Sequence, residues 1–217
     1  MNVISFISAN YVAREVGYHM NGGWGQGENA TNAFFRPERT FAERFDALLA
    51  SIGALGYTAV DLWTAHLHPQ WATKHHVAAA RDLLARHGMT VPSMAGGFGE
   101  NEAELRTACR LARDLGCSIL SGGQGLLKTG RPRLAAVLRE EGMRLAVENH
   151  PEKSGAELLA RMGAGDEDVI GAAVDTGWFG TQGCDAELVK RYGGLGLGMA
   201  ISKALMEVQG GLHRGNE

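Results

Sequence analysis

The sequence predicts an α/β fold of the (β/α)8 TIM-barrel type that is incomplete, with about six clear βα units and an irregular C-terminal closure. Short apolar runs typical of buried strands alternate with helical patterns along the chain. Glycine and polar residues follow almost every run, as they do at the functional rim of such barrels. The G-x-G-x-x-G loop of dinucleotide-binding folds is missing after the first run, which disfavours a doubly wound sheet.

The first unit has a long connection. Residues 3–18 mix β-branched and aromatic side chains and predict the first strand, and the Gly-rich residues 17–32 predict a long loop over a site. Thr40 is the expected N-cap of the next helix, with Glu43 as its partner in a capping box. Gly53 marks the expected end of that helix.

The later units are more regular. Their strands are predicted at residues 57–63, 90–95, 118–120, 145–147 and 170–174. Their helices are predicted at residues 75–87, after the caps Asn101 and Ser154, and from Pro132 to Gly142. The residues that follow Thr176 are too few for two more units of this size, so we expect at most one further strand.

Composition limits the class of protein. The 217 residues carry a net charge of -3 with scattered basic residues, which argues against a nucleic-acid partner. Three cysteines without a Cys-x-x-Cys motif are typical of reduced thiols in a cytoplasmic protein. No run approaches the ~18 apolar residues of a membrane span, and the start does not resemble a signal peptide.

Two carboxylates end neighbouring strands. Glu148 follows the run at 145–147, and Asp175 follows the run at 170–174. Because a helix joins these strands, they are parallel, and both carboxylates are expected at the same C-terminal edge. Hard divalent cations take oxygen ligands, so the pair predicts half of a metal site. The structural alternative is a helix cap at one residue and a surface ion pair at the other.

Several segments resemble a known family, the xylose isomerase-like TIM barrels of sugar phosphate isomerases and epimerases. The resemblance covers roughly residues 1–188, which we treat as one domain. It is carried by GYHMNGGWGQGENATNAFFRPERTFAERFDALL, VDLWTAHLHPQWAT, AGGFG, VENHPEKS and VDTGWFGTQGCDA. It implies a divalent-metal-dependent isomerase or epimerase that moves a proton through an enediolate, with a small sugar or sugar phosphate as substrate.

The same resemblance implies site residues. Glu148 and Asp175 match two family ligands for a divalent ion (Mn, Mg, Co or Zn), and Glu148 also matches the catalytic acid/base. A histidine near His66 contacts substrate or metal in related barrels. Trp178 stands where many relatives have a substrate-contacting histidine.

Two further substrate contacts are predicted from the residues themselves. His150 lies two positions after Glu148, so it is expected to orient that carboxylate or to touch a sugar hydroxyl. Trp63, like Trp178, could pack its ring against sugar C–H surfaces. Loop-facing or simple packing roles are the alternatives for all of them.

The C-terminal part departs from the family. The strand-seven histidine and strand-eight glutamate ligands have no counterpart, and residues 189–217 form an atypical Gly-rich tail. Its segment GGLGLGMAISKALMEVQGG resembles the G2 box of histidine-kinase ATP-binding domains, although an amphipathic helix is the favoured interpretation. The alternatives to an isomerase are therefore an ATP-binding fragment, an abasic-site endonuclease, and a non-catalytic truncated barrel that self-associates over its open edge.

Overall fold

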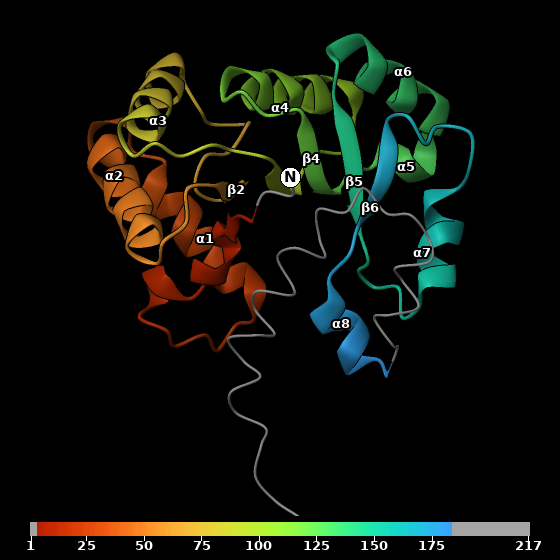
Figure 1. Cartoon of the computed structure of the whole chain (residues 1–217), viewed down its shortest axis with the longest axis horizontal. Coiled ribbons are helices and arrows are strands. Elements are labelled where there is room, and N and C mark those ends of the chain that lie inside the picture. The colour runs from red at the N-terminus through yellow and green to blue at the C-terminus, as the bar shows by residue number, and fades with distance from the viewer. Residues whose placement is uncertain (1–3, 184–217) are drawn as a thin grey trace, which may run out of the picture.

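The protein forms a curved parallel sheet with helices around its outer side (Figure 1). The structure is a computed structural model that describes residues 4–183, apart from the side chains of Thr176 and Thr181. Within this range the six strands lie in chain order, and each pairs in parallel with the next. The strands are β1 (Phe6–Ile7), β2 (Val60–Trp63), β3 (Met94–Gly97), β4 (Ile119–Gly123), β5 (Arg144–Glu148) and β6 (Ile170–Ala173). The predicted six-unit barrel-like fold is thus confirmed.

One or two α-helices follow each strand. They are α1 (Trp24–Phe35), α2 (Glu38–Ala54), α3 (Lys74–Arg86), α4 (Glu102–Asp114), α5 (Leu126–Thr129), α6 (Arg131–Glu141), α7 (Gly155–Met162) and α8 (Thr176–Thr181). Two of the predicted N-caps are present. Asn101 and Ser154 each accept a hydrogen bond from the backbone amide three residues later, which satisfies a donor of the first helical turn.

The two faces of the sheet differ in side-chain size. On β4, Leu120 is fully buried in the main core, which fills the space between the sheet and the outer helices. The next residue, Ser121, points to the inner face, because successive side chains of a strand alternate. The inner face also carries Ala95, Ala146 and Ala173, beside the larger Ile119. Complete barrels fill this interior with bulky branched residues, whereas the alanines and Ser121 here leave open space.

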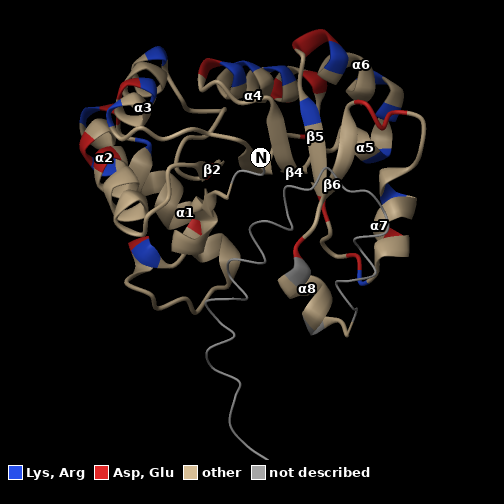
Figure 2. Cartoon of the chain, in the orientation of Figure 1, with Lys and Arg blue, Asp and Glu red and all other residues tan. Residues whose placement is uncertain are grey.

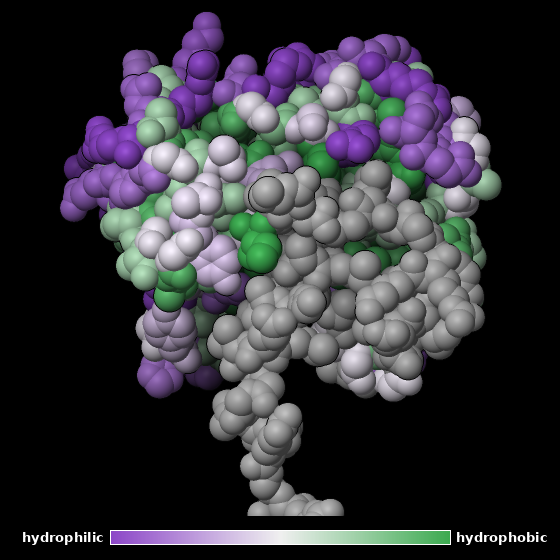
Figure 3. Space-filling model, in the orientation of Figure 1, coloured by the Kyte–Doolittle hydropathy of each residue, from purple (hydrophilic) through white to green (hydrophobic). Residues whose placement is uncertain are grey.

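Charged residues lie mainly on the outer helices. Figure 2 shows Lys, Arg, Asp and Glu along α2, α3, α4 and α6, and Figure 3 shows hydrophilic surface over the same outer layer. Arg106 of α4, for example, pairs with Glu102 and with two glutamates of α6. The apolar strands lie beneath this layer, so the sheet is shielded from water on its helical side.

The N-terminal unit differs from the prediction. The first strand covers only Phe6–Ile7, because the chain then turns into short 3-10 helices at Ser8–Tyr11 and Arg14–Val16. The predicted loop at 17–32 contains most of α1 instead. Gly27 of α1 lies so close to the preceding segment that a Cβ there would be 2.2 Å from the Val12 carbonyl oxygen. The glycine thus permits close packing of a helix and does not mark a loop.

The start of α2 also differs. Its N-cap is Pro37, and the helix begins at Glu38, two residues before the predicted cap at Thr40. The Thr40 hydroxyl donates to the Pro37 carbonyl and does not cap the helix. In the part of the chain that the structure describes, no helix combines the length and apolar character needed to cross a membrane. The predicted tail domain at 189–217 and its G2-like motif lie outside the described residues.

Candidate metal centre

The carboxyl ends of β5 and β6 bring the two predicted carboxylates together. Glu148 is the last residue of β5, and Asp175 follows the end of β6 by two residues. The register pairs Glu148 with Ala173, so both strands reach the same rim of the sheet. This arrangement follows from the parallel crossover through α7, as the order of the segments predicts.

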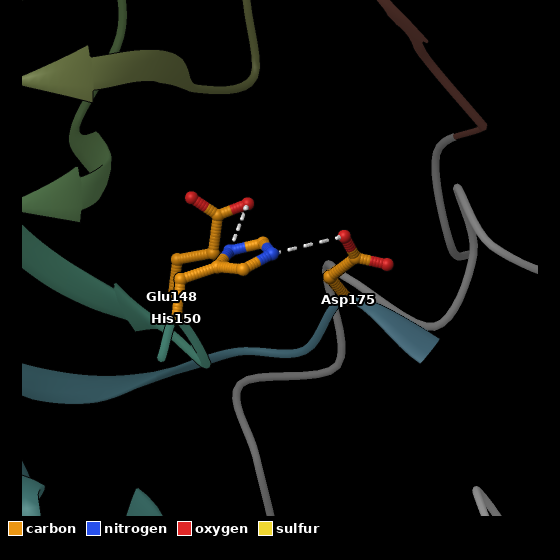
Figure 4. Close-up of side chains that lie close together, drawn as sticks. All are labelled: Glu148, His150 and Asp175. Atoms are coloured by element: carbon orange, nitrogen blue, oxygen red, sulfur yellow. Dashed lines mark ion pairs between the residues drawn. The ribbon is translucent and has the colours of Figure 1, made fainter. Parts of the chain in front are cut away.

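His150 lies between the two carboxylates (Figure 4). Its Nδ1 is 3.5 Å from Glu148 Oε1, and its Nε2 is 3.7 Å from Asp175 Oδ2. One donor atom from each of the three residues falls within 4.8 Å of the others. Two carboxylates and an imidazole are a donor set that divalent cations accept. The three side chains could therefore hold a single cation, and His150 is a candidate ligand, whereas the sequence suggested that it orients the Glu148 carboxylate or contacts substrate.

The two carboxylate oxygens of Asp175 have different partners. Asp175 is the N-cap of α8, and its Oδ1 accepts a hydrogen bond from the Trp178 amide at 3.0 Å. The other oxygen, Oδ2, faces His150. Helix capping and a metal-directed carboxylate were alternatives at the sequence level, and the geometry allows one residue to do both. The cap holds the carboxylate in a fixed orientation.

Glu148 has an unusual electrostatic environment. Its side chain is half-exposed at the cavity wall, and the surrounding protein partly desolvates the carboxylate. This desolvation raises the pKa of Glu148, and the nearby Asp175 carboxylate raises it further, while His150 acts in the opposite direction. A raised pKa brings a carboxylate closer to the range in which it can both take up and release a proton near neutral pH.

Two residues that the sequence analysis missed support the rim. Asn149 is fully buried and makes hydrogen bonds to both backbone groups of Asp175. Arg161 of α7 reaches back and donates to the carbonyl oxygens of Glu148 and His150 and to the Glu152 carboxylate. The only sequence signal for either is its place beside or after the Glu148 strand.

The three donor residues border a cavity of about 780 Å³ at the inner face of the sheet. Its lining comes from β1 to β6, the strand-end loops and α1. The lining residues are Ile7, Ala9, Asn10, Val12, Trp24, Glu28, Trp63, Ala95, Gly96, Gly97, Ser121, Glu148, His150, Ala173, Val174 and Asp175. This volume falls in the range typical of small-molecule sites.

Trp63 and Trp178 have different positions. Trp63 lies in the cavity wall, and its ring meets Trp24 edge to face at a centroid distance of 5.6 Å. The Trp178 ring instead packs against His150 at 4.6 Å, and its Nε1 donates to the Glu152 carbonyl. Trp178 is not among the lining residues, so its present position suits support of His150 better than contact with a ligand in the cavity.

His66 lies away from the cavity surface. Its side chain is buried between Phe35 and Trp63, and its Nδ1 is 3.2 Å from the Ser8 hydroxyl. Burial lowers the pKa of His66 to about 3, so the imidazole is neutral at physiological pH. This is a packing position behind Trp63, and it does not match the substrate contact predicted for His66 from the resemblance.

Comparison with known proteins identifies the fold. No family model matches the sequence, and no curated protein matches it. Among solved structures, the chain is similar to a xylose isomerase-like TIM barrel protein from Mycobacterium smegmatis, crystallised in complex with magnesium. The TM-score is 0.50 at 16% sequence identity, and the match covers 65% of this chain and 58% of the other. This chain therefore spans less than two thirds of the length of that protein, and its fold is that of a partial TIM barrel.

Proposed function

We propose that the chain is a divalent-metal-dependent isomerase or epimerase that acts on a small sugar or sugar phosphate. The observation that carries this proposal is the convergence of Glu148, His150 and Asp175 within 4.8 Å beside a cavity at the strand ends. Catalytic residues of TIM barrels come from this rim. The fold of the magnesium-bound relative is consistent with the proposal.

Glu148, His150 and Asp175 would hold the cation. A bound divalent ion would polarise a sugar carbonyl and stabilise negative charge on oxygen. The three donors differ in their other partners. The Oδ1 atom of Asp175 already accepts the capping hydrogen bond of α8. Among the described residues, the Glu148 carboxylate has a side-chain contact with His150 and lines the cavity, so it can turn towards a ligand there. Glu148 is thus the better candidate for a second role.

We assign the proton transfer to Glu148. Its carboxylate would take the proton from the hydroxyl-bearing carbon next to the carbonyl, and the electron pair of that C–H bond would form the C=C bond of an enediolate. Return of that proton to the former carbonyl carbon, together with transfer of the hydroxyl proton to the former carbonyl oxygen, would complete an aldose–ketose isomerisation, with the new carbonyl at the carbon that lost its proton. The Glu148 carboxyl group must accept and then release this proton, and its place at the cavity wall puts it within reach of a bound sugar.

The cavity wall opposite the carboxylates suits a sugar. Trp63 and Trp24 supply ring surface, and apolar ring faces pack against sugar C–H groups. Asn10 and Glu28 add polar groups that can accept or donate hydrogen bonds to hydroxyls. The same cavity would exclude large polymers, which favours a small-molecule substrate over a nucleic acid.

Deuterium exchange tests the proposal directly. The purified chain would be incubated in D₂O with Mn²⁺ and a panel of aldoses, ketoses and their phosphates, and the sugars would be examined by NMR. We expect deuterium at the carbon next to the carbonyl for at least one sugar, and none with Glu148→Gln. If Mn²⁺ binds but no sugar exchanges, the chain is a non-catalytic barrel and the proposal is wrong.

A further inference from the structure

Asn149 joins the two halves of the candidate metal centre. Its Nδ2 donates to the Asp175 carbonyl at 2.9 Å, and its Oδ1 accepts from the Asp175 amide at 2.5 Å. Both contacts come from one side chain that is completely buried. Its neighbours in sequence, Glu148 and His150, supply two of the three candidate metal donors. The Asn149 side chain therefore links this segment to Asp175, which supplies the third.

The Asn149 side-chain amide makes the hydrogen bonds to the Asp175 backbone that a neighbouring strand would otherwise make. The β5–β6 ladder ends at the pair Glu148 and Ala173, and within residues 4–183 the backbone of Asp175 makes no hydrogen bond to the backbone of β5. A carboxamide offers one acceptor and one donor, as a peptide group does. Only one orientation of the Asn149 amide satisfies both the amide and the carbonyl of Asp175, so its hydrogen bonds also fix which atom is oxygen.

Asp175 is then held at two levels. Asn149 fixes its backbone on both sides, and the Trp178 amide fixes its carboxylate through Oδ1. The remaining oxygen, Oδ2, is directed at His150. Loss of the Asn149 contacts would remove the side-chain partner of the Asp175 amide and leave the Asp175 carbonyl with the Phe179 amide at 3.3 Å, so the backbone of Asp175 would be held less firmly.

We propose that Asn149 is a positioning residue that sets the separation between the Glu148 and Asp175 carboxylates, and thereby the affinity for the cation. The proposal concerns the same centre as the proposed function and rests on it for the identity of the ligand. Outer residues that orient metal ligands typically change metal affinity by roughly 10- to 100-fold when they are replaced. No carboxylate or imidazole of the site is altered by a change at Asn149, so its effect would be indirect.

The chain provides a matched control in Gln124. This residue is also a buried amide at a strand end, and it bridges two backbone groups, the Leu126 amide and the Asn101 carbonyl. It follows β4 and does not line the cavity. Asn149→Leu and Gln124→Met are therefore equivalent changes, since each keeps the shape of the side chain and removes both hydrogen bonds.

The test measures Mn²⁺ affinity by titration calorimetry and the melting temperature of the metal-free protein. We expect both variants to melt at a lower temperature, but only Asn149→Leu to weaken Mn²⁺ binding, by about tenfold or more. Gln124→Met should bind Mn²⁺ within about twofold of the unmodified chain. Equal affinities in all three proteins, or equal losses in both variants, would overturn the proposal.

Hydrogen exchange of the unmodified chain provides a second measurement that needs neither metal nor a folded variant. The Asp175 amide should be protected, because its hydrogen bond partner is the buried Asn149 side chain. Rapid exchange at Asp175 would contradict the positioning role. If the unmodified chain binds no Mn²⁺ while the Asp175 amide is protected, the proposed function is wrong, but the two hydrogen bonds from Asn149 to Asp175 are supported.

Discussion

His150 Nε2 lies 3.7 Å from Asp175 Oδ2, so a residue that follows β5 contacts the carboxylate of a residue that follows β6. The same imidazole contacts Glu148 through Nδ1 at 3.5 Å. The two nitrogens of one ring thus face the two carboxylates, which keeps the acidic groups apart while they share one site. A neutral imidazole offers a metal one lone pair, so His150 would turn one nitrogen to a bound ion.

Replacement of His150 should weaken metal binding. Loss of a residue that only orients a metal ligand typically lowers metal affinity by roughly 10- to 100-fold. We expect His150→Ala to lower the Mn²⁺ affinity by at least this much, because it removes a direct donor. Titration calorimetry of the chelator-treated protein measures this change.

His75→Ala provides the control for the His150 variant. The His75 side chain is 84% exposed on α3, pairs with Glu38 and does not line the cavity. Its removal should leave Mn²⁺ affinity unchanged. If both histidine variants bind Mn²⁺ as well as the unmodified chain, His150 is not a ligand and the cation would depend on the carboxylates alone.

Two neighbouring residues of β4 should differ in how strongly a change of side-chain size affects stability. Leu120→Ala removes a fully buried side chain between the sheet and the helices, and we expect a loss of about 2–5 kcal/mol in the free energy of unfolding. Ser121→Leu adds volume on the cavity side, and we expect a change within about 1 kcal/mol. Urea unfolding measures both. Similar costs for the two variants would mean that the inner face is as tightly packed as the outer one.

The pH dependence of stability should contain a contribution from Asp61. This carboxylate is buried, and burial raises its pKa even though the Ser5 and Ser93 hydroxyls donate hydrogen bonds to it. The folded state therefore holds the proton more tightly than the unfolded state does. The resulting stabilisation is fully present below the unfolded pKa and is lost as pH rises through the folded pKa.

Asp61→Asn should remove this contribution. The asparagine has no charge to bury, so its stability relative to the unmodified chain should increase as pH is raised from 4 to 8. Melting curves at several pH values test this, with the exposed Asp82→Asn of α3 as the control. Parallel pH profiles for the unmodified chain and the Asp61 variant would show that Asp61 does not titrate differently in the folded state.

The sequence was informative where local rules dominate. Each later strand overlaps a predicted short run of mainly apolar residues. Caps such as Asn101 and Ser154 form the predicted hydrogen bonds, because capping depends on residues only three positions apart. The meeting of Glu148 and Asp175 could also be predicted, since parallel strands joined by one helix must end at the same rim.

Other features depend on contacts between distant segments. The helix at Trp24–Phe35 exists although its sequence is rich in glycine, because Gly27 packs against Val12. His66 was expected at the site, but its ring lies between Phe35 of α1 and Trp63 of β2, which no local pattern reveals. The hydrogen bonds between Asn149 and Asp175 join residues 26 positions apart, so no local pattern predicts them either.

Metal titration of the chelator-treated chain beside Glu148→Gln and Asp175→Asn tests the central claim most directly. The exposed Glu43→Gln of α2 is the matched control for removal of one negative charge. We predict saturable Mn²⁺ binding by the unmodified chain and by Glu43→Gln, and loss of most of that affinity in both site variants. Unchanged Mn²⁺ binding in Glu148→Gln and Asp175→Asn would contradict the claim that these two carboxylates share a cation.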